Sequence, residues 1–576
     1  MRSKVWRQRV VQVAPSGWPA HVHPVIQRVY AARGVCTPDG VEHRLARMLP
    51  PSMLGGMDRA VDLLMRAILD DRRIVIAGDY DCDGATGTAV AERGLRLLGA
   101  RRVGHVVPNR FVHGYGLSEA LVASLDPAPD LIVTVDNGVA SVAGVAAARA
   151  RGIQVLITDH HLPGDVLPDA DAIVNPNLAG DGFPSKSLAG VGVMFYLLLG
   201  LRAAMREAGH FAAGEPDMAS LLDLVALGTV ADLVPLDFNN RVLVEAGLKR
   251  MRAGKACAGI AALVEASGRS LATVGATDLA FAVGPRLNAA GRLEDMSLGV
   301  ACLLTDDYGM ARRYAEQLSA INQERRDMQA GMVEEAETMA AQAAHIDAVG
   351  VALFDAGWHP GVVGLVASKL KEKLHRPVVA FAPAGDDSDE LRGSARSIPG
   401  FHIRDALAGV DAKHPGMILR FGGHAMAAGL SLRAGDFERF ATAFDTMARM
   451  LIDDERLQAL VQTDGELDYG DHTLDLARQL RHAGPWGQGF PPPVFEGRFE
   501  CVSWKPMGSR HLRLQLRHMQ AGAPLDAVMF NAFDGSPPPS HLRAAYELSV
   551  NDWQGRETLR LLLVHMEPDE QKYPAP

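Results

Sequence analysis

Short apolar runs alternate with amphipathic stretches between residues 60 and 161. Three of the runs, "RIVIAG" (73–78), "LIVTVDNG" (131–138) and "IQVLITDHH" (153–161), each contain at least three consecutive apolar residues, as expected for strands buried on both faces. Between and before them lie stretches with helical spacing, at 60–69, 87–100 and 141–152. Strands that are apolar on both faces and alternate with helices predict a parallel, doubly wound α/β sheet.

The pattern changes three times after this α/β region. Residues 306–345 are rich in helix formers and predict one long helix that connects two domains. A second α/β unit follows, and from residue 456 short β-rich runs separated by turn residues predict a small barrel. The predicted order is an N-terminal segment (1–60), a first α/β domain (61–305), the connecting helix (306–345), a second α/β domain (346–455) and a β-barrel domain (456–576).

Composition describes a globular protein of several domains. The chain has 576 residues, of which 48% are hydrophobic and 22% charged. Its five cysteines form no CxxC pair, and this favours a reducing cytoplasm over a disulfide framework. The first residues lack the apolar core of a signal peptide, and the longest apolar run (188–201) is too short for a bilayer, so we expect no membrane association.

Acidic or imidazole side chains follow each of the three predicted strands. In open α/β sheets, ligands bind outside the carboxyl ends of the strands, so these side chains are expected to meet in one crevice. A fourth apolar segment (221–236) ends in a turn that carries another aspartate. The residues are Asp79, Asp81 and Asp83 after the first strand, Asp136 after the second, Asp159, His160 and His161 after the third, and Asp232 in the turn.

Each group alone has an ordinary explanation. Three aspartates after a strand can form a solvated turn, a single aspartate there often caps a helix, and a histidine pair can be a surface or core feature. Together, however, the carboxylates would repel one another unless cations lay between them. Carboxylate and imidazole ligands without thiolate favour two divalent cations, manganese or magnesium, over structural zinc.

The segments "GDYDCDG", "VDNG", "TDHH" and "GTVADLVPL" resemble the four motifs of the DHH phosphoesterase superfamily. The resemblance implies hydrolysis of phosphate esters with two bound metals, and it places His161 against the scissile phosphate. Several relatives have a histidine where this chain has Ala77, so Asp79 or a water would take that ligand position. The implied metal ligands are Asp81, Asp83, Asp136 as the bridging ligand, His160 and Asp232, with Asp79 as the open case.

Three further segments offer candidate substrate contacts. Arginine suits phosphate, and a tyrosine ring can stack on a base. The glycine-rich stretches among them also fit tight turns or close helix packing, so this alternative stays open. The candidates are Asn109, Arg110 and Tyr115 in 107–118, Arg286 and Asn288 in 284–293, and, in a third segment made of the stretches 392–398 and 420–429, Ser394, Arg396, Gly422, Gly423 and His424.

Local charge differs from the overall charge. The net charge of −10 argues mildly against a nucleic-acid partner. Between residues 498 and 518, however, five basic residues and Trp504 accompany a single acid, Glu500. Such a segment on a small β fold indicates a platform for single-stranded nucleic acid, with a solvated basic face as the alternative. The basic residues are Arg498, Lys505, Arg510, Arg513 and Arg517.

Motif order and domain order over residues 60–570 resemble the RecJ family of bacterial single-strand-specific exonucleases. "GGHAMAAG" is similar to the GGH motif of the DHHA1 domain, and "GPWGQGFPPPVFEG" to the segment that enters an OB-fold barrel. The resemblance implies a monomeric 5′→3′ exonuclease on single-stranded DNA that releases mononucleotides in DNA repair and recombination. It also implies single-strand binding protein and a RecQ-type helicase as partners.

Two other functions remain open from the sequence. The first is a DHH phosphodiesterase for short oligonucleotides or cyclic dinucleotides, or a pyrophosphatase, although these relatives lack the β-rich C-terminal domain. The second is a DNA-binding scaffold without catalysis, although such proteins lose metal ligands that this chain retains.

Overall fold

The computed structural model describes residues 4–109, 112–212, 214–342, 347–385, 388–520, 522–553 and 555–569. It divides into two compact units, which are described separately. The larger unit comprises residues 8–319 and 462–576, and the smaller unit comprises residues 1–7 and 320–461. Both units are therefore discontinuous in sequence, and residues 320–461 of the smaller unit are inserted within the larger one.

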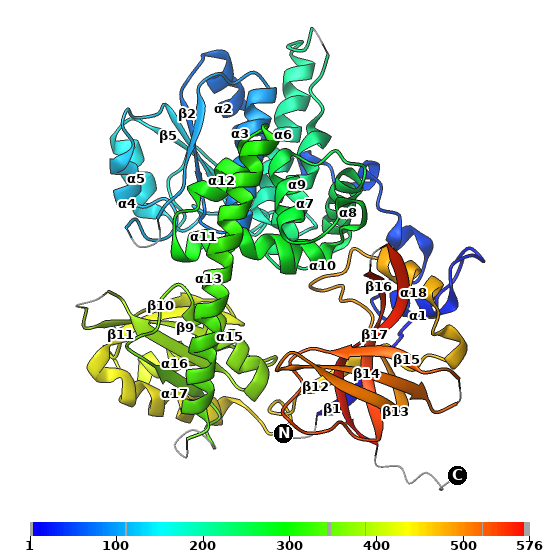
Figure 1. The fold of residues 1–576 in the computed structure, drawn as a ribbon. Coiled ribbons are helices and arrows are strands. Elements are labelled where there is room, and N and C mark those ends of the chain that lie inside the picture. Colours follow the sequence, from blue (N-terminus) through cyan, green and yellow to red (C-terminus); the bar gives the residue numbers. More distant parts are fainter. Residues whose placement is uncertain are drawn as a thin grey trace. The chain divides into compact units, whose positions relative to one another are not determined.

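The larger unit contains the predicted parallel sheet (Figure 1). Its five strands lie in the order β3-β2-β4-β5-β6, and all neighbouring pairs are parallel. The strands are β2 (Ile74–Gly78), β3 (Val103–Val106), β4 (Leu131–Val135), β5 (Gln154–Thr158) and β6 (Ala172–Val174). The prediction of a parallel α/β domain is confirmed.

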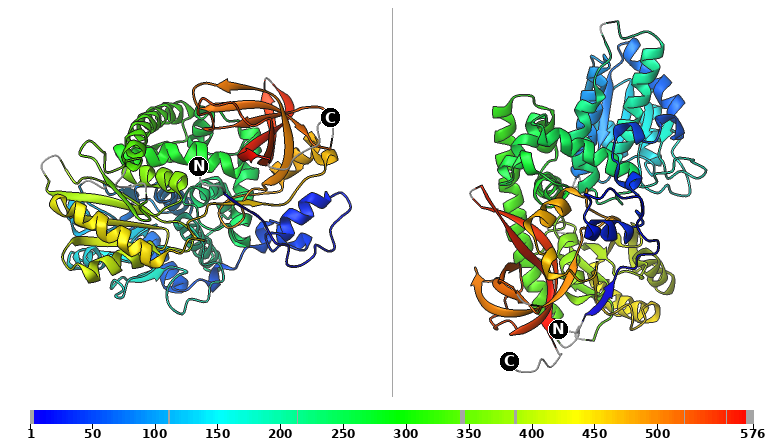
Figure 2. Two further views of the ribbon diagram at one scale, coloured as in Figure 1. Left: turned by 90° about the horizontal axis from the view of Figure 1, so that it is seen from below. Right: turned by 90° about the vertical axis from the view of Figure 1, so that its right-hand side faces the viewer.

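Alternate residues of the central strands enter two different apolar clusters. Ile74 and Ile76 of β2 belong to the main core with helices α2, α3 and α6, whereas Val75 and Ala77 pack with α4 and α5 in a separate cluster. Helices therefore cover both faces of the sheet, as Figures 1 and 2 show. This explains why the strands are apolar at every position. The helices are α2 (Met57–Leu69), α3 (Cys82–Leu97), α4 (Glu119–Ser124), α5 (Val142–Ala150) and α6 (Gly190–Glu207).

A helical region follows the sheet. It includes a π-helical turn, Leu279–Val283, that leads directly into α11. Its helices are α7 (Leu222–Ala231), α8 (Phe238–Arg252), α9 (Ala258–Ala266), α10 (Ala276–Asp278), α11 (Gly284–Leu293) and α12 (Ser297–Leu304). Helix α13 (Tyr308–Ala340) then runs continuously from the residues of the larger unit into those of the smaller one, which confirms the predicted connecting helix.

The smaller unit is a five-stranded mixed sheet with the order β10-β11-β9-β8-β7. Only β7 and β8 are parallel; the other neighbouring pairs are antiparallel. Its strands are β7 (Val351–Phe354), β8 (Val378–Pro383), β9 (Glu390–Arg396), β10 (Ile418–Gly423) and β11 (Ala427–Arg433), and its helices are α15 (Val363–Leu374), α16 (Ile403–Lys413) and α17 (Phe437–Leu451). The glycine-rich segments of this domain therefore form strands.

The C-terminal domain is a closed five-stranded barrel with the order β13-β14-β15-β17-β16, as predicted. Its interior is apolar and is continuous with the main core of the parallel-sheet domain, since Phe490, Phe499 and Leu514 belong to the same cluster as α7 and α8. The strands are β13 (Phe495–Met507), β14 (His511–His518), β15 (Leu525–Met529), β16 (His541–Trp553) and β17 (Arg556–Pro568), and α18 (Leu474–His482) precedes them.

The N-terminal segment is tied to the chain that enters the barrel. Strand β1 (Val5–Gln8) pairs with β12 (Leu460–Thr463) in a two-stranded sheet. After helix α1 (Pro24–Ala31), Arg33 donates from Nη1 to Oδ1 of the buried Asp464 at 2.8 Å, 431 positions along the chain. Tyr30, at the end of α1, donates its hydroxyl hydrogen to the carbonyl of Ala483 at 2.7 Å.

Seven short 3₁₀ turns complete the described secondary structure; they are Pro38–Val41, Leu45–Arg47, Pro51–Met53, Met218–Leu221, Leu271–Thr273, Ala434–Asp436 and Tyr469–Asp471. Among the described residues, no helix combines the length and the apolarity needed to cross a bilayer. All five cysteines are free thiols.

Candidate active site

The acidic and imidazole side chains predicted from the sequence meet at the carboxyl edge of the parallel sheet. The loops after β2, β4 and β5 supply most of them, and the C-terminus of α7 supplies Asp232. Three overlapping groups have ligand atoms within 4.8 Å of one another: Asp79 with Asp81 and Asp136, Asp83 with His160 and Asp232, and Asp136 with His160 and His161. Every predicted metal ligand belongs to at least one group.

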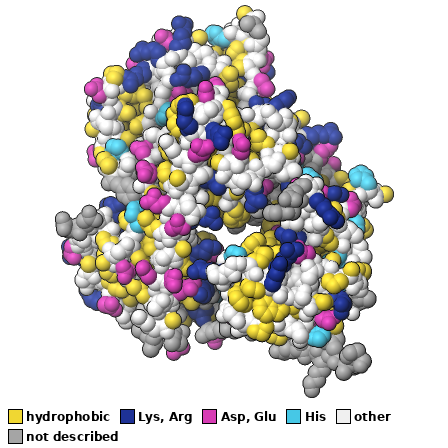
Figure 3. Space-filling view, viewed as in Figure 1, with side chains coloured by type: hydrophobic (Ala, Val, Ile, Leu, Met, Phe, Trp, Pro, Cys, Tyr) yellow, Lys and Arg dark blue, Asp and Glu magenta, His cyan; other side chains and the backbone are white. Residues whose placement is uncertain are grey.

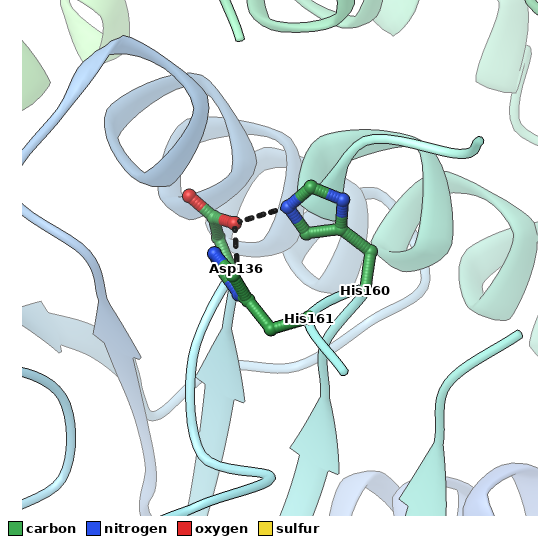
Figure 4. Close-up of side chains that lie close together, drawn as sticks. All are labelled: Asp136, His160 and His161. Carbon is green, nitrogen blue, oxygen red and sulfur yellow. Dashed lines mark ion pairs between the residues drawn. The ribbon is translucent and has the colours of Figure 1, made fainter. Parts of the chain in front are cut away.

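Asp136 lies at the centre of this arrangement (Figure 4). Its Oδ1 atom is 3.0 Å from Nε2 of His160 and 4.0 Å from Nδ1 of His161. His160 Nε2 also lies 3.6 Å from Oδ2 of Asp232, so one imidazole reaches both carboxylates. Asp136 Oδ1 is buried, yet it accepts no hydrogen bond from the described residues. A buried carboxylate oxygen without a donor, next to an imidazole nitrogen, fits a metal ligand.

The aspartates after β2 differ in how the backbone holds them. Asp81 caps α3, because its Oδ1 accepts from the Gly84 N–H at 3.0 Å. Asp83, in the first turn of α3, accepts from the Gly190 N–H at 2.6 Å and from the Val191 N–H at 3.0 Å. These two donors begin α6, so the positive end of that helix faces Asp83. Asp79 Oδ1 accepts from the N–H of the next residue at 2.7 Å.

Burial and mutual repulsion raise the pKa of several of these carboxyl groups. Burial, and then the charges of Asp232 and Asp81, raise the pKa of Asp83. The pKa of Asp136 is raised by burial and then by Asp83 and Asp81. Burial and the charge of Asp81 raise the pKa of Asp232 to about 7. Divalent cations among these side chains would favour the ionised forms and offset the repulsion, which again fits a metal centre.

Asp159 organises the histidine pair and is not available as a ligand. Its Oδ1 accepts from the backbone N–H groups of His160 and His161 at 2.7 and 3.1 Å, and it lies 2.7 Å from His161 Nδ1. Its Oδ2 accepts from the Val139 N–H at 2.9 Å. Burial alone would lower the pKa of His161, but the hydrogen bond and charge of Asp159 outweigh it and raise that pKa to about 9. The pairing with Asp159 therefore favours the protonated imidazole of His161.

Three asparagines that the sequence analysis did not single out hold the loops in place. Asn137 donates from Nδ2 to the carbonyls of Ala77 and Val135 at 3.0 and 2.9 Å, and so ties β2 to the end of β4. Asn175 and Asn177, beyond β6, donate to the carbonyls of His161 and His160 at 2.9 and 2.5 Å. Asn137 lies in the "VDNG" motif, and the signal for Asn175 and Asn177 is the run "VNPN" after an apolar strand.

Backbone conformation and close packing also place Asp136. Its φ is 63°, in the left-handed region, which costs a non-glycine residue free energy. A Cβ on Gly190 would lie 2.5 Å from the Cβ of Asp136, so only glycine allows α6 to start here. Position 77 carries a buried alanine that packs in the apolar cluster of α4 and α5. The carboxylate of Asp79 is instead the one that lies beside Asp81 and Asp136.

Of the predicted substrate contacts on the larger unit, Tyr115 lies beside the metal site. Its ring packs edge-to-face on His161 with centroids 6.2 Å apart, and on Tyr80 at 6.0 Å. The backbone N–H of Asn109 donates to His113 Nδ1 at 3.1 Å. Arg110 lies outside the described residues.

Helix α11 carries the next two predicted contacts. Arg286 donates from Nε to Ser319 Oγ at 3.0 Å and from Nη2 to the carbonyl of Ala266 at 3.3 Å. Asn288 Oδ1 accepts from the Cys82 N–H at 2.7 Å, in the loop between Asp81 and Asp83. The structure thus brings Asn288 to the candidate metal site, where its side chain bonds to the backbone N–H of Cys82.

The remaining predicted contacts lie on the smaller unit, where strand pairing brings them together. Gly422 of β10 pairs with Gly429 of β11, which pairs in turn with Ser394 of β9. Arg396 donates to Ser394 Oγ at 2.9 Å, and both side chains lie against Gly364 in the first turn of α15. Gly423 has a φ of 140°, and a Cβ there would lie 2.5 Å from the Ala427 carbonyl oxygen, with which the His424 N–H bonds at 2.8 Å.

The barrel surface carries fewer unpaired basic groups than its sequence suggests. Arg513 bonds to Asp526 at 2.8 Å, and Arg517 bonds to Glu500 at 2.8 Å. Lys505 and Arg510 are exposed and have no acidic partner among the described residues. Trp504 is 39% exposed beside them in sequence. In Figure 3, basic and hydrophobic side chains lie together over the barrel.

The fold and the site define a DHH-type phosphoesterase domain with two accessory domains. The DHH family, N-terminal domain model matches residues 73–229, the DHHA1 domain model matches 346–450, and the RecJ OB domain model matches 463–565. The first of these ranges contains every carboxylate and imidazole of the site except Asp232.

Two bacterial RecJ proteins and one RecJ crystal structure are similar to this chain over most of their length. The single-stranded-DNA-specific exonuclease RecJ of Dickeya dadantii is 50% identical, with 96% of this chain and 97% of that protein covered. The RecJ of Escherichia coli is 48% identical, with coverage of 96% and 97%. A crystal structure of RecJ from Thermus thermophilus in complex with Mn²⁺ matches with a TM-score of 0.80 at 30% identity, and covers 99% of this chain and 81% of that one. The chain belongs to the RecJ family.

Proposed function

We propose that this chain is a metal-dependent exonuclease specific for single-stranded DNA, which removes mononucleotides in the 5′→3′ direction. The observation that carries the proposal is the convergence of carboxylates and imidazoles from three strand ends and from α7. Family membership supports the substrate, since the named relatives are single-stranded-DNA-specific exonucleases. The direction and the mononucleotide product rest on the motif resemblance.

Asp81, Asp83, Asp136, His160 and Asp232 would hold two divalent cations, manganese or magnesium, with Asp79 as a further ligand. Relatives crystallised with Mn²⁺ and with Mg²⁺ support a divalent ion of this kind. When bound, such ions act as Lewis acids that activate water and neutralise phosphate charge.

His161 stabilises the charge that develops on the phosphoryl oxygens. Asp159 holds the imidazole through Nδ1 and keeps it protonated, so that Nε2–H is the group left to donate to substrate. Tyr115, whose ring packs on His161, positions the terminal nucleotide. Asn109, Arg110 and Arg286 are further proposed contacts of the strand.

The smaller unit and the barrel bind the strand beyond the scissile bond. On the smaller unit, Gly422 and Gly423 lie on β10, with β11 between them and the strand that carries Ser394 and Arg396, and these residues together can hold a phosphate. His424 adjoins it. Burial lowers the pKa of Arg396, yet a guanidinium remains charged at any physiological pH. On the barrel, Trp504 and Lys505 offer a ring and a positive charge.

The cellular setting is also part of the proposal. The enzyme acts as a monomer in the cytoplasm, in DNA repair and recombination, with single-strand binding protein and a RecQ-type helicase as partners. Free thiols throughout the chain support a reducing compartment.

The test compares single-stranded DNA labelled at the 5′ end with the same strand labelled at the 3′ end, with and without Mn²⁺. We expect the 5′ label to be released first as a mononucleotide, only when metal is present. Early release of the 3′ label would contradict the direction. Rapid cleavage of dinucleotides with no attack on long strands would instead indicate a phosphodiesterase for short oligonucleotides.

A further inference from the structure

Helix α11 (Gly284–Leu293) lies against the loop that carries Asp81 and Asp83 at two points. Asn288 Oδ1 accepts a hydrogen bond from the Cys82 N–H at 2.7 Å, although the residues are 206 positions apart. A Cβ on Gly291 would lie 1.8 Å from the carbonyl oxygen of Tyr80, so the backbones of helix and loop are in direct contact there. Residues 288 and 291 are three apart and therefore lie on one face of the helix.

The hydrogen bond from Cys82 satisfies a group that α3 itself cannot satisfy. Cys82 is the first residue of α3, and the first N–H groups of a helix have no partner within it. Asp81 provides one acceptor at this end, for the Gly84 N–H, and Asn288 provides another from a distant helix. Because Cys82 lies between Asp81 and Asp83 in the chain, fixing its backbone fixes the directions in which both carboxylates project.

The residues just before α11 determine which side of this helix faces residues 80–82. Leu279–Val283 form a π-helical turn, which contains one residue more than an α-helical turn. One additional residue rotates every later side chain by about 100° around the helix axis. The π-turn thus belongs to the features that bring Asn288 and Gly291 to the loop. Such turns are frequent at functional sites.

We infer that Asn288 is a positioning residue: it sets the first metal-binding loop through the Cys82 N–H, in place of the substrate contact that the sequence predicts. The inference rests on the proposed function in one respect, namely that Asp81 and Asp83 bind metal. Like Asp232, Asn288 lies beyond the residues matched by the DHH model, which ends at residue 229. Residues that orient ligands typically change metal affinity about 10–100-fold when removed.

The experiment measures Mn²⁺ binding to the full chain without DNA, by the electron paramagnetic resonance signal of free Mn²⁺. We expect Asn288→Ala to weaken binding about tenfold. Asn288→Asp keeps an oxygen acceptor for the Cys82 N–H and should bind Mn²⁺ within about threefold of wild type. On single-stranded DNA, Asn288→Ala should lower kcat at limiting Mn²⁺, recover with excess Mn²⁺, and leave KM within about twofold.

Asn239 provides a matched control in the same unit. Its Oδ1 likewise accepts a backbone hydrogen bond, from Leu49 at 3.1 Å, and a second one from the Tyr196 hydroxyl at 2.8 Å. Asn239→Ala should lower the melting temperature and leave Mn²⁺ affinity unchanged. If Asn288→Ala does not fold, Asn288→Ser, with a shorter acceptor, supplies the binding measurement.

Wild-type Mn²⁺ affinity in Asn288→Ala would overturn the inference. So would a large rise of KM in Asn288→Asp with normal Mn²⁺ affinity, because a new negative charge would then be repelling a phosphate. The binding measurement does not depend on nuclease activity. A wild-type chain that binds Mn²⁺ but leaves single-stranded DNA intact would therefore contradict the proposed function, while the Mn²⁺ affinities would still decide the role of Asn288.

Discussion

The carboxyl edge of the parallel sheet and the outer surface of the barrel both gather charged side chains, but they balance them differently. At the sheet edge, Asp81, Asp83 and Asp136 face one another, and burial adds to their repulsion. On the barrel, Arg513 and Arg517 each face an acid at 2.8 Å. The carboxylates at the sheet edge thus remain unbalanced at a place where bound cations could neutralise them. On the barrel, Arg513 and Arg517 are neutralised by acids of the protein itself, which leaves few basic groups for contact with DNA.

The largest effect on activity is expected from substitution of Asp136, at the centre of the carboxylate cluster. Asp136→Ala should reduce hydrolysis by at least about 10³-fold, because it removes the proposed bridging ligand, and should change the Kd for single-stranded DNA by less than about threefold. Gel-based nuclease assays and fluorescence anisotropy provide the two measurements. Residual activity within tenfold of wild type would refute the assignment of the site.

A methyl group beside the same aspartate should also have a strong effect. Gly190→Ala places a Cβ 2.5 Å from the Cβ of Asp136, so the start of α6 and the aspartate must move apart. We expect about a 10²-fold loss of activity and about 1–3 kcal/mol lower unfolding free energy. Gly182→Ala is the control, since nothing lies within 4 Å of a Cβ there. Equal activities of the two variants would show that the close packing at Gly190 does not matter.

Trp504 and Lys505 on the barrel surface should contribute moderately to the binding of single-stranded DNA. The double variant Trp504→Ala, Lys505→Ala should raise the Kd for long single strands about tenfold and leave dinucleotide hydrolysis unchanged, because it removes one stacking ring and one free charge. These point changes are preferable to removal of the barrel, whose interior is continuous with the main core. A matching loss of dinucleotide hydrolysis would place these residues in catalysis instead.

The smallest effect on DNA binding is expected from substitution of Arg513, whose charge is paired with an acid. Arg513→Ala should change the Kd for DNA by less than about twofold and the unfolding free energy by less than about 1 kcal/mol, since Asp526 also pairs with Arg560 at 2.8 Å. The single variant Lys505→Ala is the comparison, because its charge is unpaired. If Arg513→Ala weakens binding more than Lys505→Ala, pairing within the barrel does not predict which basic residues bind DNA.

Hydrophobic pattern and strand ends predict the fold and most of the candidate site. The apolar runs identify β2, β4 and β5, and the edge rule brings Asp136 and His160 together before any coordinates are known. The strands follow from the local sequence, and the meeting of Asp136 with His160 follows from the local sequence and one rule of sheet topology.

The features that the sequence did not reveal depend on contacts between distant residues. Gly190 looks like any helix-start glycine until its distance to Asp136 is known, and Asn175 stands in an unremarkable loop. On the barrel, a count of basic residues between 498 and 518 overlooks Asp526, because that partner lies on a neighbouring strand. Asn288 was assigned to substrate from its neighbours in sequence, whereas its Oδ1 bonds to a residue 206 positions away.

The hydrogen bond between Arg33 and Asp464 has a consequence for synthesis on the ribosome. The two residues are 431 positions apart, and residues 320–461 of the smaller unit lie between them in sequence. At about 5–20 residues per second, the N-terminal segment leaves the ribosome about 20–90 s before its partner does. The inserted unit can fold during that interval, whereas the segment around Arg33 must remain without its final partner. Co-translational folding of this chain can therefore complete the contacts of the N-terminal segment only after residue 464 has been made.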